Sequence, residues 1–153
     1  AMPGFLEQAR NMGVRFFLNH PEPAPDWPVS GQHWTEARLQ AATGKLSEPF
    51  GVSCHGGECL ARAARLHARY AFLSPLFATQ THPDAPALGI ERFAELIAPA
   101  AVPVIALGGM TPERVAAARA AGASGIAVLS GILEAEDPAS ATRAFLDAWN
   151  THA

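Results

Sequence analysis

The stretch PVIALGGMTP, residues 103–112, decides the fold class of this chain. Its first half is apolar, which predicts a β-strand that ends before the pair Gly108-Gly109. Its final Thr-Pro is a helix start, a capping residue followed by proline at the first helical position. The stretch GIAVLSGI, residues 125–132, repeats the strand and its glycine-containing turn one helix later. Two strands joined through a helix predict a right-handed βαβ crossover and a parallel sheet.

The same alternation extends over the rest of the chain. Short β-branched or aromatic runs alternate with alanine-rich amphipathic segments of about ten residues. Strands are expected at residues 14–18, 32–34, 50–54, 70–73, 104–107 and 125–129, and helices at 4–11, 35–42, 58–68, 90–97, 112–121 and 138–149. About six βα units of an α/β fold follow one another, which leaves either a doubly wound sheet or a TIM-type barrel.

Composition limits the kind of molecule. The 153 residues, 49% of them hydrophobic and 16% charged, fit one globular domain over 1–153 and exclude a disordered chain. The net charge of -3 and the scattering of the 11 Lys and Arg residues predict no nucleic-acid and no membrane partner, so we expect a small-molecule ligand. No apolar stretch reaches the roughly 20 residues that cross a bilayer. No secretory signal is visible, so the expected location is cytoplasmic.

Cys54 and Cys59 are the two cysteines of the chain. This low count fits a reducing compartment better than a disulfide framework, so we expect buried thiols. Together with His55 and His67 they could approach one metal ion, but C-x4-C is not a zinc spacing. We therefore assign no metal site.

Glycines after two consecutive strands favour the barrel over the open sheet. The chain has neither a GxGxxG nor a P-loop motif. Gly108-Gly109 and Ser130-Gly131 instead follow neighbouring strands, where TIM barrels commonly bind phosphate. Glycine lets a phosphate approach backbone N–H groups that a Cβ would shield, and the Ser130 hydroxyl would add a donor. The alternative is that the glycines only turn the chain before a helix.

Four motifs carry a family resemblance: GVSCH at 51–55, TQTHPDAPALG at 79–89, and the two stretches quoted above. With them the chain resembles the thiamine phosphate synthase and thiazole tautomerase family of TIM barrels, strongly over 50–148 and more weakly over 5–38. The resemblance implies an incomplete or swapped TIM-type barrel that lacks the family's first two strands. Its opening would expose apolar faces and unpaired backbone, so we expect a second copy to cover it in a homo-oligomer.

The resemblance also implies the residues of a site. Gly108, Gly109, Ser130 and Gly131 match the loops that hold the thiazole phosphate. His55 matches the histidine that shuttles a proton in the tautomerase, and imidazole suits this role because it accepts and donates protons near neutral pH. The expected substrate-loop residues are Asn19, Thr79, Thr81 and His82.

The residues that the family uses for synthase activity, in which magnesium neutralises a departing pyrophosphate, are matched less well in this sequence. The strand that supplies most of the family's pyrophosphate-binding cations has no counterpart. His20 follows Asn19 where the family has an acid, and His82 replaces a lysine. Arg38 occupies the second metal-binding position, unless a shifted register brings Glu36 there.

We therefore expect tautomerase-like chemistry on a thiazole phosphate. Three alternatives remain open. The chain could be a catalytically degenerate binding or regulatory module, a genuine thiamine phosphate synthase, which is a transferase that would use Mg²⁺, or a different phosphosugar isomerase on the same barrel.

Overall fold

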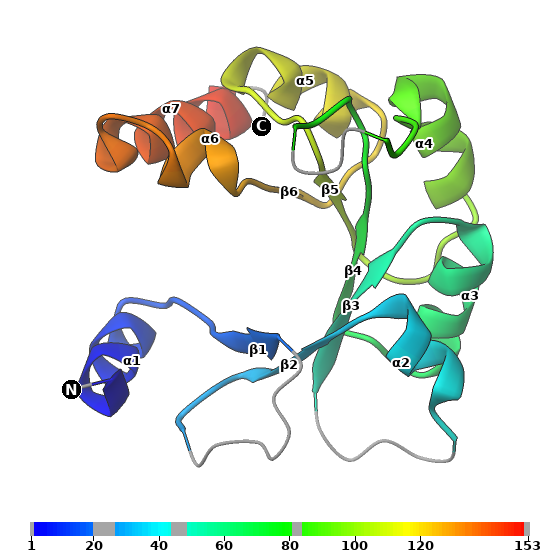
Figure 1. Ribbon diagram of the computed structural model, residues 1–153, viewed down its shortest axis with the longest axis horizontal. Coiled ribbons are helices and arrows are strands. Elements are labelled where there is room, and N and C mark those ends of the chain that lie inside the picture. The colour runs from blue at the N-terminus through cyan, green and yellow to red at the C-terminus, as the bar shows by residue number, and fades with distance from the viewer. Residues whose placement is uncertain (1, 20–26, 44–48, 81–83, 152–153) are drawn as a thin grey trace.

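Six parallel strands form one curved sheet in the order of the sequence, β1 to β6 (Figure 1). The computed structural model describes residues 2–19, 27–43, 49–80 and 84–151. Within them the strands are β1 (Phe17–Asn19), β2 (Gly31–Trp34), β3 (Phe50–Cys54), β4 (Tyr70–Leu73), β5 (Val104–Leu107) and β6 (Gly125–Ala127). Each strand pairs with the next in parallel, as where Gly51 lies opposite Tyr70. The result is a TIM-type half-barrel that is open between β1 and β6, as the sequence analysis predicted.

The helices follow the strands on the outside of this curve. They are α1 (Met2–Asn11), α2 (Glu36–Ala41), α3 (Gly57–Arg65), α4 (Gly89–Ile97), α5 (Pro112–Ala120), α6 (Ser130–Leu133) and α7 (Pro138–Thr151). Figure 1 shows α2 to α5 along the convex side, with α1 at one end of the sheet and α6 and α7 at the other. Helices α1 and α7 therefore lie at opposite ends of the sheet. Among the described residues, no helix has the length and apolar character that a membrane span requires.

Side chains and prolines start several of these helices. The Thr35 hydroxyl accepts a hydrogen bond from the backbone N–H of Arg38 at 3.2 Å, and so caps α2. Asp137 caps α7 in the same way, accepting from the N–H groups of Ala139 and Ser140. Thr111 has the extended backbone expected before α5, but its side chain caps no helical N–H, so the proline that follows defines this start.

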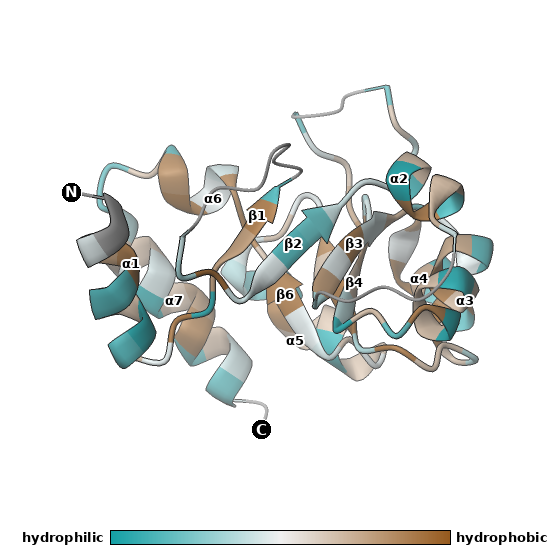
Figure 2. Ribbon diagram, turned by 90° about the horizontal axis from the view of Figure 1, so that it is seen from below, coloured by the Kyte–Doolittle hydropathy of each residue, from teal (hydrophilic) through white to brown (hydrophobic). Residues whose placement is uncertain are grey.

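The core lies between the sheet and its outer helices. Alternate residues of β3 and β4 point to that side, so Phe50, Val52 and Leu73 are almost fully buried against helical residues such as Leu60 and Phe93. Ser53, Tyr70 and Phe72, which alternate with them, are half-buried. Figure 2 shows hydrophobic residues in β1 and β6, hydrophilic residues in β2, and hydrophilic residues on outer turns of α1, α2 and α3.

The two edge strands are shorter than the sequence predicts. The strand expected at 14–18 is β1 at 17–19, and the strand expected at 125–129 ends at Ala127. An edge strand pairs on one side only, so its ends have no second neighbour to hold them extended. Val14 and Leu129, in the parts that are not strand, are 45% and 57% exposed. Helix α3 also ends earlier than expected, at Arg65, and the chain turns at His67 with a φ of 59°.

Candidate active site

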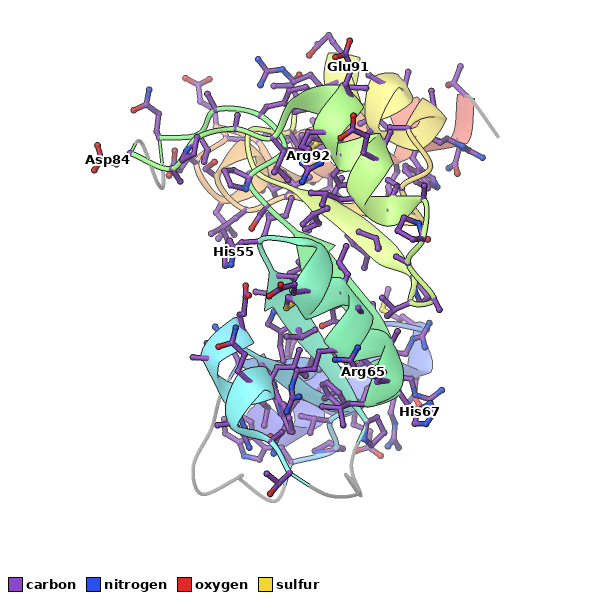
Figure 3. The ribbon with its side chains drawn as sticks, turned by 90° about the vertical axis from the view of Figure 1, so that its right-hand side faces the viewer. His55, Arg65, His67, Asp84, Glu91 and Arg92 are labelled. Atoms are coloured by element: carbon purple, nitrogen blue, oxygen red, sulfur yellow. A yellow bond between two sulfur atoms is a disulfide. The ribbon has the colours of Figure 1, made fainter. Side chains whose placement is uncertain are left out.

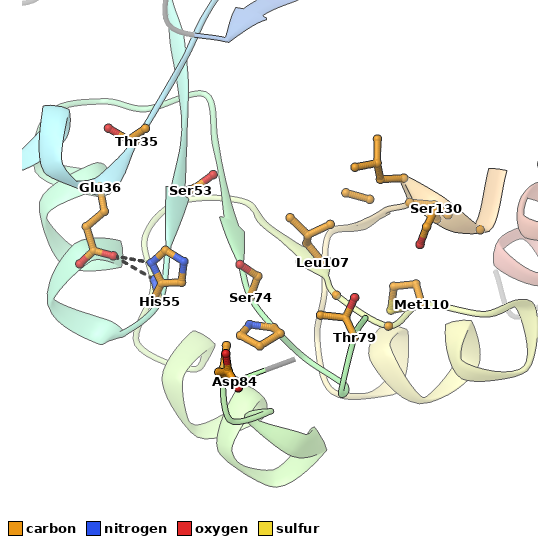
Figure 4. A pocket seen from close by; sticks show the side chains of 18 residues that line it. Thr35, Glu36, Ser53, His55, Ser74, Thr79, Asp84, Leu107, Met110 and Ser130 are labelled. Atoms are coloured by element: carbon orange, nitrogen blue, oxygen red, sulfur yellow. Dashed lines mark hydrogen bonds and ion pairs between the residues drawn. The ribbon is translucent and has the colours of Figure 1, made fainter. Parts of the chain in front are cut away.

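A cavity of about 790 Å³ lies at the carboxyl ends of the strands. This is the edge at which parallel barrels place their ligands, because every βα loop begins there. Figure 4 shows the side chains that surround it. Its lining comprises Thr35, Glu36, Ser53, His55, Ser74, Pro75, Thr79, Asp84, Ala85, Leu107, Gly108, Gly109, Met110, Ala127, Val128, Leu129, Ser130 and Gly131.

The cavity brings together most of the residues that the sequence singled out. His55, Thr79 and the two glycine-containing loops at 108–109 and 130–131 all line it. Asn19 ends β1 at the same edge of the sheet, but it is not among the residues that line this cavity. Thr81 and His82 lie outside the described residues. The structure thus places the acid/base candidate and both phosphate loops around one space.

Packing explains why the first of these loops is glycine. Gly108 and Gly109 have φ values of 101° and 59°, a backbone region that other residues rarely adopt. A Cβ on Gly109 would lie 2.4 Å from the carbonyl oxygen of Ala78, and one on Gly108 would lie 2.8 Å from Pro75 Cα. The N–H of Phe77 also donates to the carbonyl of Gly108 at 3.1 Å. The glycines therefore let the loop after β5 pack on the loop after β4, whatever they contribute to a ligand.

His55 is held by a carboxylate from the neighbouring βα unit. Glu36 Oε2 lies 2.9 Å from His55 Nδ1 and 3.2 Å from its backbone nitrogen. Glu36 is 26% exposed and His55 62%, so the pair lies at the rim of the cavity rather than in the core. Figure 3 shows His55 at the same edge of the molecule as Asp84, while Arg65 and His67 lie far from that edge.

Arg38, which the resemblance aligns with a metal-binding position, is not among the described residues that line the cavity. The Arg38 guanidinium lies 4.6 Å from the centre of the Trp34 ring, and Trp34 in turn stacks on Phe50. The acid that reaches the cavity from this segment is Glu36, which the sequence analysis offered only for a shifted register. A helix places residues two apart on different faces, so Glu36 and Arg38 cannot both face the strand ends.

A buried histidine supports the floor of the cavity. His33, 9% exposed, lies 2.8 Å through Nε2 from the Ser53 hydroxyl and 3.0 Å through Nδ1 from the Tyr70 hydroxyl. Burial lowers the pKa of His33 and raises the pKa of Tyr70 to about 12, so a neutral imidazole lies beside a protonated phenol. Ser53 lines the cavity, and its hydroxyl is therefore oriented from within the sheet.

The expectation of free thiols is wrong. Cys54 and Cys59 form a disulfide, with Cα atoms 5.5 Å apart, although both residues are buried as expected. Cys54 ends β3 and Cys59 lies in α3, and the tight turn between them brings the two sulfur atoms together. A count of two cysteines could not reveal this, because pairing depends on the distance between the residues and not on their number.

Metal-ligating side chains do not gather in one cluster among the described residues. No group of three His, Cys, Asp or Glu side chains converges within the described ranges. Of the two carboxylates on the cavity, Glu36 is bound to His55. No Lys or Arg is among the described residues that line this cavity. Among these described residues, the donors that a phosphate could meet are backbone N–H groups and hydroxyls.

Several lining residues were not predicted, and one rule could have found them. Thr35 and Ser74 each stand directly after the last residue of a strand. In a parallel barrel this position always faces the ligand edge, so a polar residue there is a site candidate even without a motif. Asp84 and Met110 lie deeper in the loops, within two of the motifs that carry the family resemblance.

The half-barrel with a cavity at the carboxyl ends of its strands belongs to the class of TIM-type α/β folds, and comparison with known proteins narrows this class to one family. A model of the thiamine monophosphate synthase family (TMP-TENI) matches residues 4–132. The chain is 35% identical over 140 residues to the thiamine-phosphate synthase of Methanoregula boonei, covering 88% of this chain and 65% of the relative. It is 42% identical over 90 residues to that of Laribacter hongkongensis, covering 58% of this chain and 42% of the relative.

A solved structure shows the same fold. The thiamine phosphate pyrophosphorylase of Pyrococcus furiosus superposes with a TM-score of 0.79 at 23% identity, over 95% of this chain and 72% of that one. The chain therefore belongs to the thiamine monophosphate synthase family. It spans less than two thirds of the length of the curated relatives that it matches. The relatives are named as synthases, so the comparisons favour the synthase alternative over the tautomerase-like chemistry that the sequence analysis preferred.

Proposed function

We propose that the chain binds the thiazole phosphate of a thiamine phosphate synthase reaction, and that it serves thiamine biosynthesis through this site. The observation that carries the proposal is the convergence of the Gly108-Gly109 and Ser130-Gly131 loops on one cavity. The family membership supplies the chemistry of the ligand. The phosphate would lie between these loops, and the rest of the ligand would extend toward His55.

The local geometry suits an anion without a cationic side chain. Arg114 donates to the Gly109 carbonyl and lies over the Phe77 ring, which holds this part of the loop in place. Ser130 follows β6 at the start of α6 and is exposed to the cavity. Its hydroxyl can donate to a phosphate oxygen, a type of charge-assisted hydrogen bond that contributes about 1.5–3 kcal/mol.

Calorimetry with four ligands tests this assignment. The four ligands are thiazole phosphate, its carboxylate, pyrimidine diphosphate and a plain phosphosugar. Thiazole phosphate should bind, while pyrimidine diphosphate and the phosphosugar should bind more weakly or not at all. The variant Ser130→Ala should weaken the binding of thiazole phosphate about tenfold or more, because it removes a hydrogen bond of this strength and about 1.4 kcal/mol corresponds to a factor of ten in affinity. Ser124→Ala is the matched control, since Ser124 lies at the opposite end of the same strand and is exposed. Equal binding by the two variants would place the phosphate elsewhere.

Synthesis itself is tested by supplying both substrates with magnesium and detecting thiamine phosphate by chromatography. A full-length relative serves as the control. Turnover comparable to the control would show that this chain alone carries the synthase reaction. Binding of thiazole phosphate without turnover would show that the chain holds one substrate and lacks the means to activate the other.

One observation favours isomerisation as a second candidate function. His55 lines the same cavity as the proposed phosphate site, and its Nδ1 contacts Glu36. A histidine so placed can move a proton on the ring of a bound thiazole carboxylate. If it does, His55→Ala should slow the isomerisation about 10²- to 10⁴-fold, while the parent rate in this variant would remove the candidate.

A further inference from the structure

A single carboxylate oxygen makes two contacts with His55. Glu36 begins α2 and His55 follows β3, so the contact joins two neighbouring βα units. Glu36 Oε2 accepts from the backbone N–H of His55 at 3.2 Å and meets its ring Nδ1 at 2.9 Å. The other oxygen, Oε1, accepts from the Gln40 side-chain amide at 3.4 Å. The carboxylate is thus held from both sides and has little freedom to leave the ring.

This contact decides which ring nitrogen carries the proton. A carboxylate only accepts hydrogen bonds, so Nδ1 of His55 must be the donor in the pair. In a neutral imidazole the other nitrogen, Nε2, is then unprotonated and accepts. His55 is 62% exposed and lines the cavity, so Nε2 is accessible to a ligand. Figure 4 shows Glu36 on the side of His55 that faces away from Ser130.

We propose that Glu36 is a positioning residue that fixes His55 as a hydrogen-bond and proton acceptor toward the cavity. The site would then select a ligand that presents a donor, an X–H group, opposite its glycine-rich end. If the proton moves, it passes from X to Nε2, the electron pair stays on X, and the imidazolium that forms is stabilised by the Glu36 carboxylate. Return of the proton to another atom of the ligand restores the neutral ring. The inference uses the proposed function only in taking this cavity as the ligand site.

The experiment reads the tautomer of His55 directly in the protein without any ligand. Long-range ¹H–¹⁵N NMR of the imidazole rings, at a pH where they are neutral, distinguishes protonated from unprotonated nitrogens, and a His55→Gln variant assigns the signals. Wild-type protein should show His55 with Nδ1 protonated and Nε2 unprotonated. Glu36→Ala should lose most of this form, because the acceptor is gone. Glu58→Ala is the matched control, since Glu58 is an exposed carboxylate three residues beyond His55.

The outcomes separate this inference from the proposed function. A His55 ring protonated at Nε2 in wild-type protein, or a tautomer unchanged in Glu36→Ala, overturns the inference; the wild-type spectrum alone decides if the variant fails to fold. Titration with inorganic phosphate on the same samples tests the phosphate loops, and wild type and Glu36→Ala should bind it equally. Loss of phosphate binding with the expected tautomer refutes the proposed function alone. A wrong tautomer with intact phosphate binding refutes the role of Glu36 alone.

Discussion

The loop contact at Gly109 should be measurable as stability. Gly109→Ala adds a methyl group where φ is 59° and where the Cβ would lie 2.4 Å from the Ala78 carbonyl and 2.9 Å from Phe77 Cβ. The left-handed backbone costs about 1–2 kcal/mol for a residue with a side chain. Overpacking adds about 1–3 kcal/mol. Replacing glycine also lowers the entropy of the unfolded chain, which stabilises the folded state by about 0.4–1 kcal/mol.

Two other glycines isolate these contributions. Gly89 has a φ of 72°, but no atom lies within 4 Å of the place that a Cβ would take. Gly89→Ala should therefore cost only the backbone strain, without the steric clash. Gly4 lies in α1 with neither strain nor a neighbour, so Gly4→Ala should be neutral or stabilising by up to about 1 kcal/mol. The expected net loss is roughly 1 kcal/mol for Gly89→Ala and roughly 3 kcal/mol for Gly109→Ala.

Thermal and urea unfolding of the three variants checks this order. At about 2–4 °C per kcal/mol for a chain of this size, Gly109→Ala should lower Tm by roughly 6–12 °C. If Gly109→Ala lost no more stability than Gly89→Ala, the two loops would not pack as tightly as described. The same reasoning excludes bulky Gly109 variants as a test of phosphate binding, because they would disturb the loop itself.

Three further predictions concern other parts of the molecule. Reduction of the Cys54–Cys59 disulfide should increase the mass by two hydrogens and lower the free energy of unfolding by about 2 kcal/mol, as expected for a short closed loop. Thiols that react without prior reduction would contradict the pairing. Burial lowers the pKa of His33 below 6.5, so the unfolded chain binds more protons than the folded chain as the pH falls below that value. The free energy of unfolding should therefore decrease at low pH. If a His33→Gln variant kept the full pH dependence in urea unfolding, the effect would belong to another group. We also propose that a second copy covers the open edges, where Phe5 and Leu133 are 59% and 71% exposed. Light scattering should show a dimer that Leu133→Glu dissociates, and a wild-type monomer at high concentration would rule it out.

The sequence by itself determined the elements whose signals are local. The strands at 50–54, 70–73 and 104–107 have the expected bounds, because each is mostly apolar and is a central strand, paired on both sides. The start of α5 was equally clear, since proline at the first helical position acts on its own backbone. Glycines after two consecutive strands also predicted the edge of the sheet at which the cavity lies, because the ends of parallel strands always meet at one side of a barrel.

Only the tertiary structure decided the contacts between segments that are far apart in the chain. Glu36 meets His55 across 19 positions, and Tyr70 meets His33 across 37, and no spacing rule predicts either pair. The reason for Gly108 and Gly109 became clear only when the loop after β4 was seen to pack against them. The disulfide and the short edge strands likewise depend on which residues a folded chain brings within reach. Local sequence sets the conformation of a segment, whereas hydrogen bonds and packing between segments require the geometry of the whole sheet.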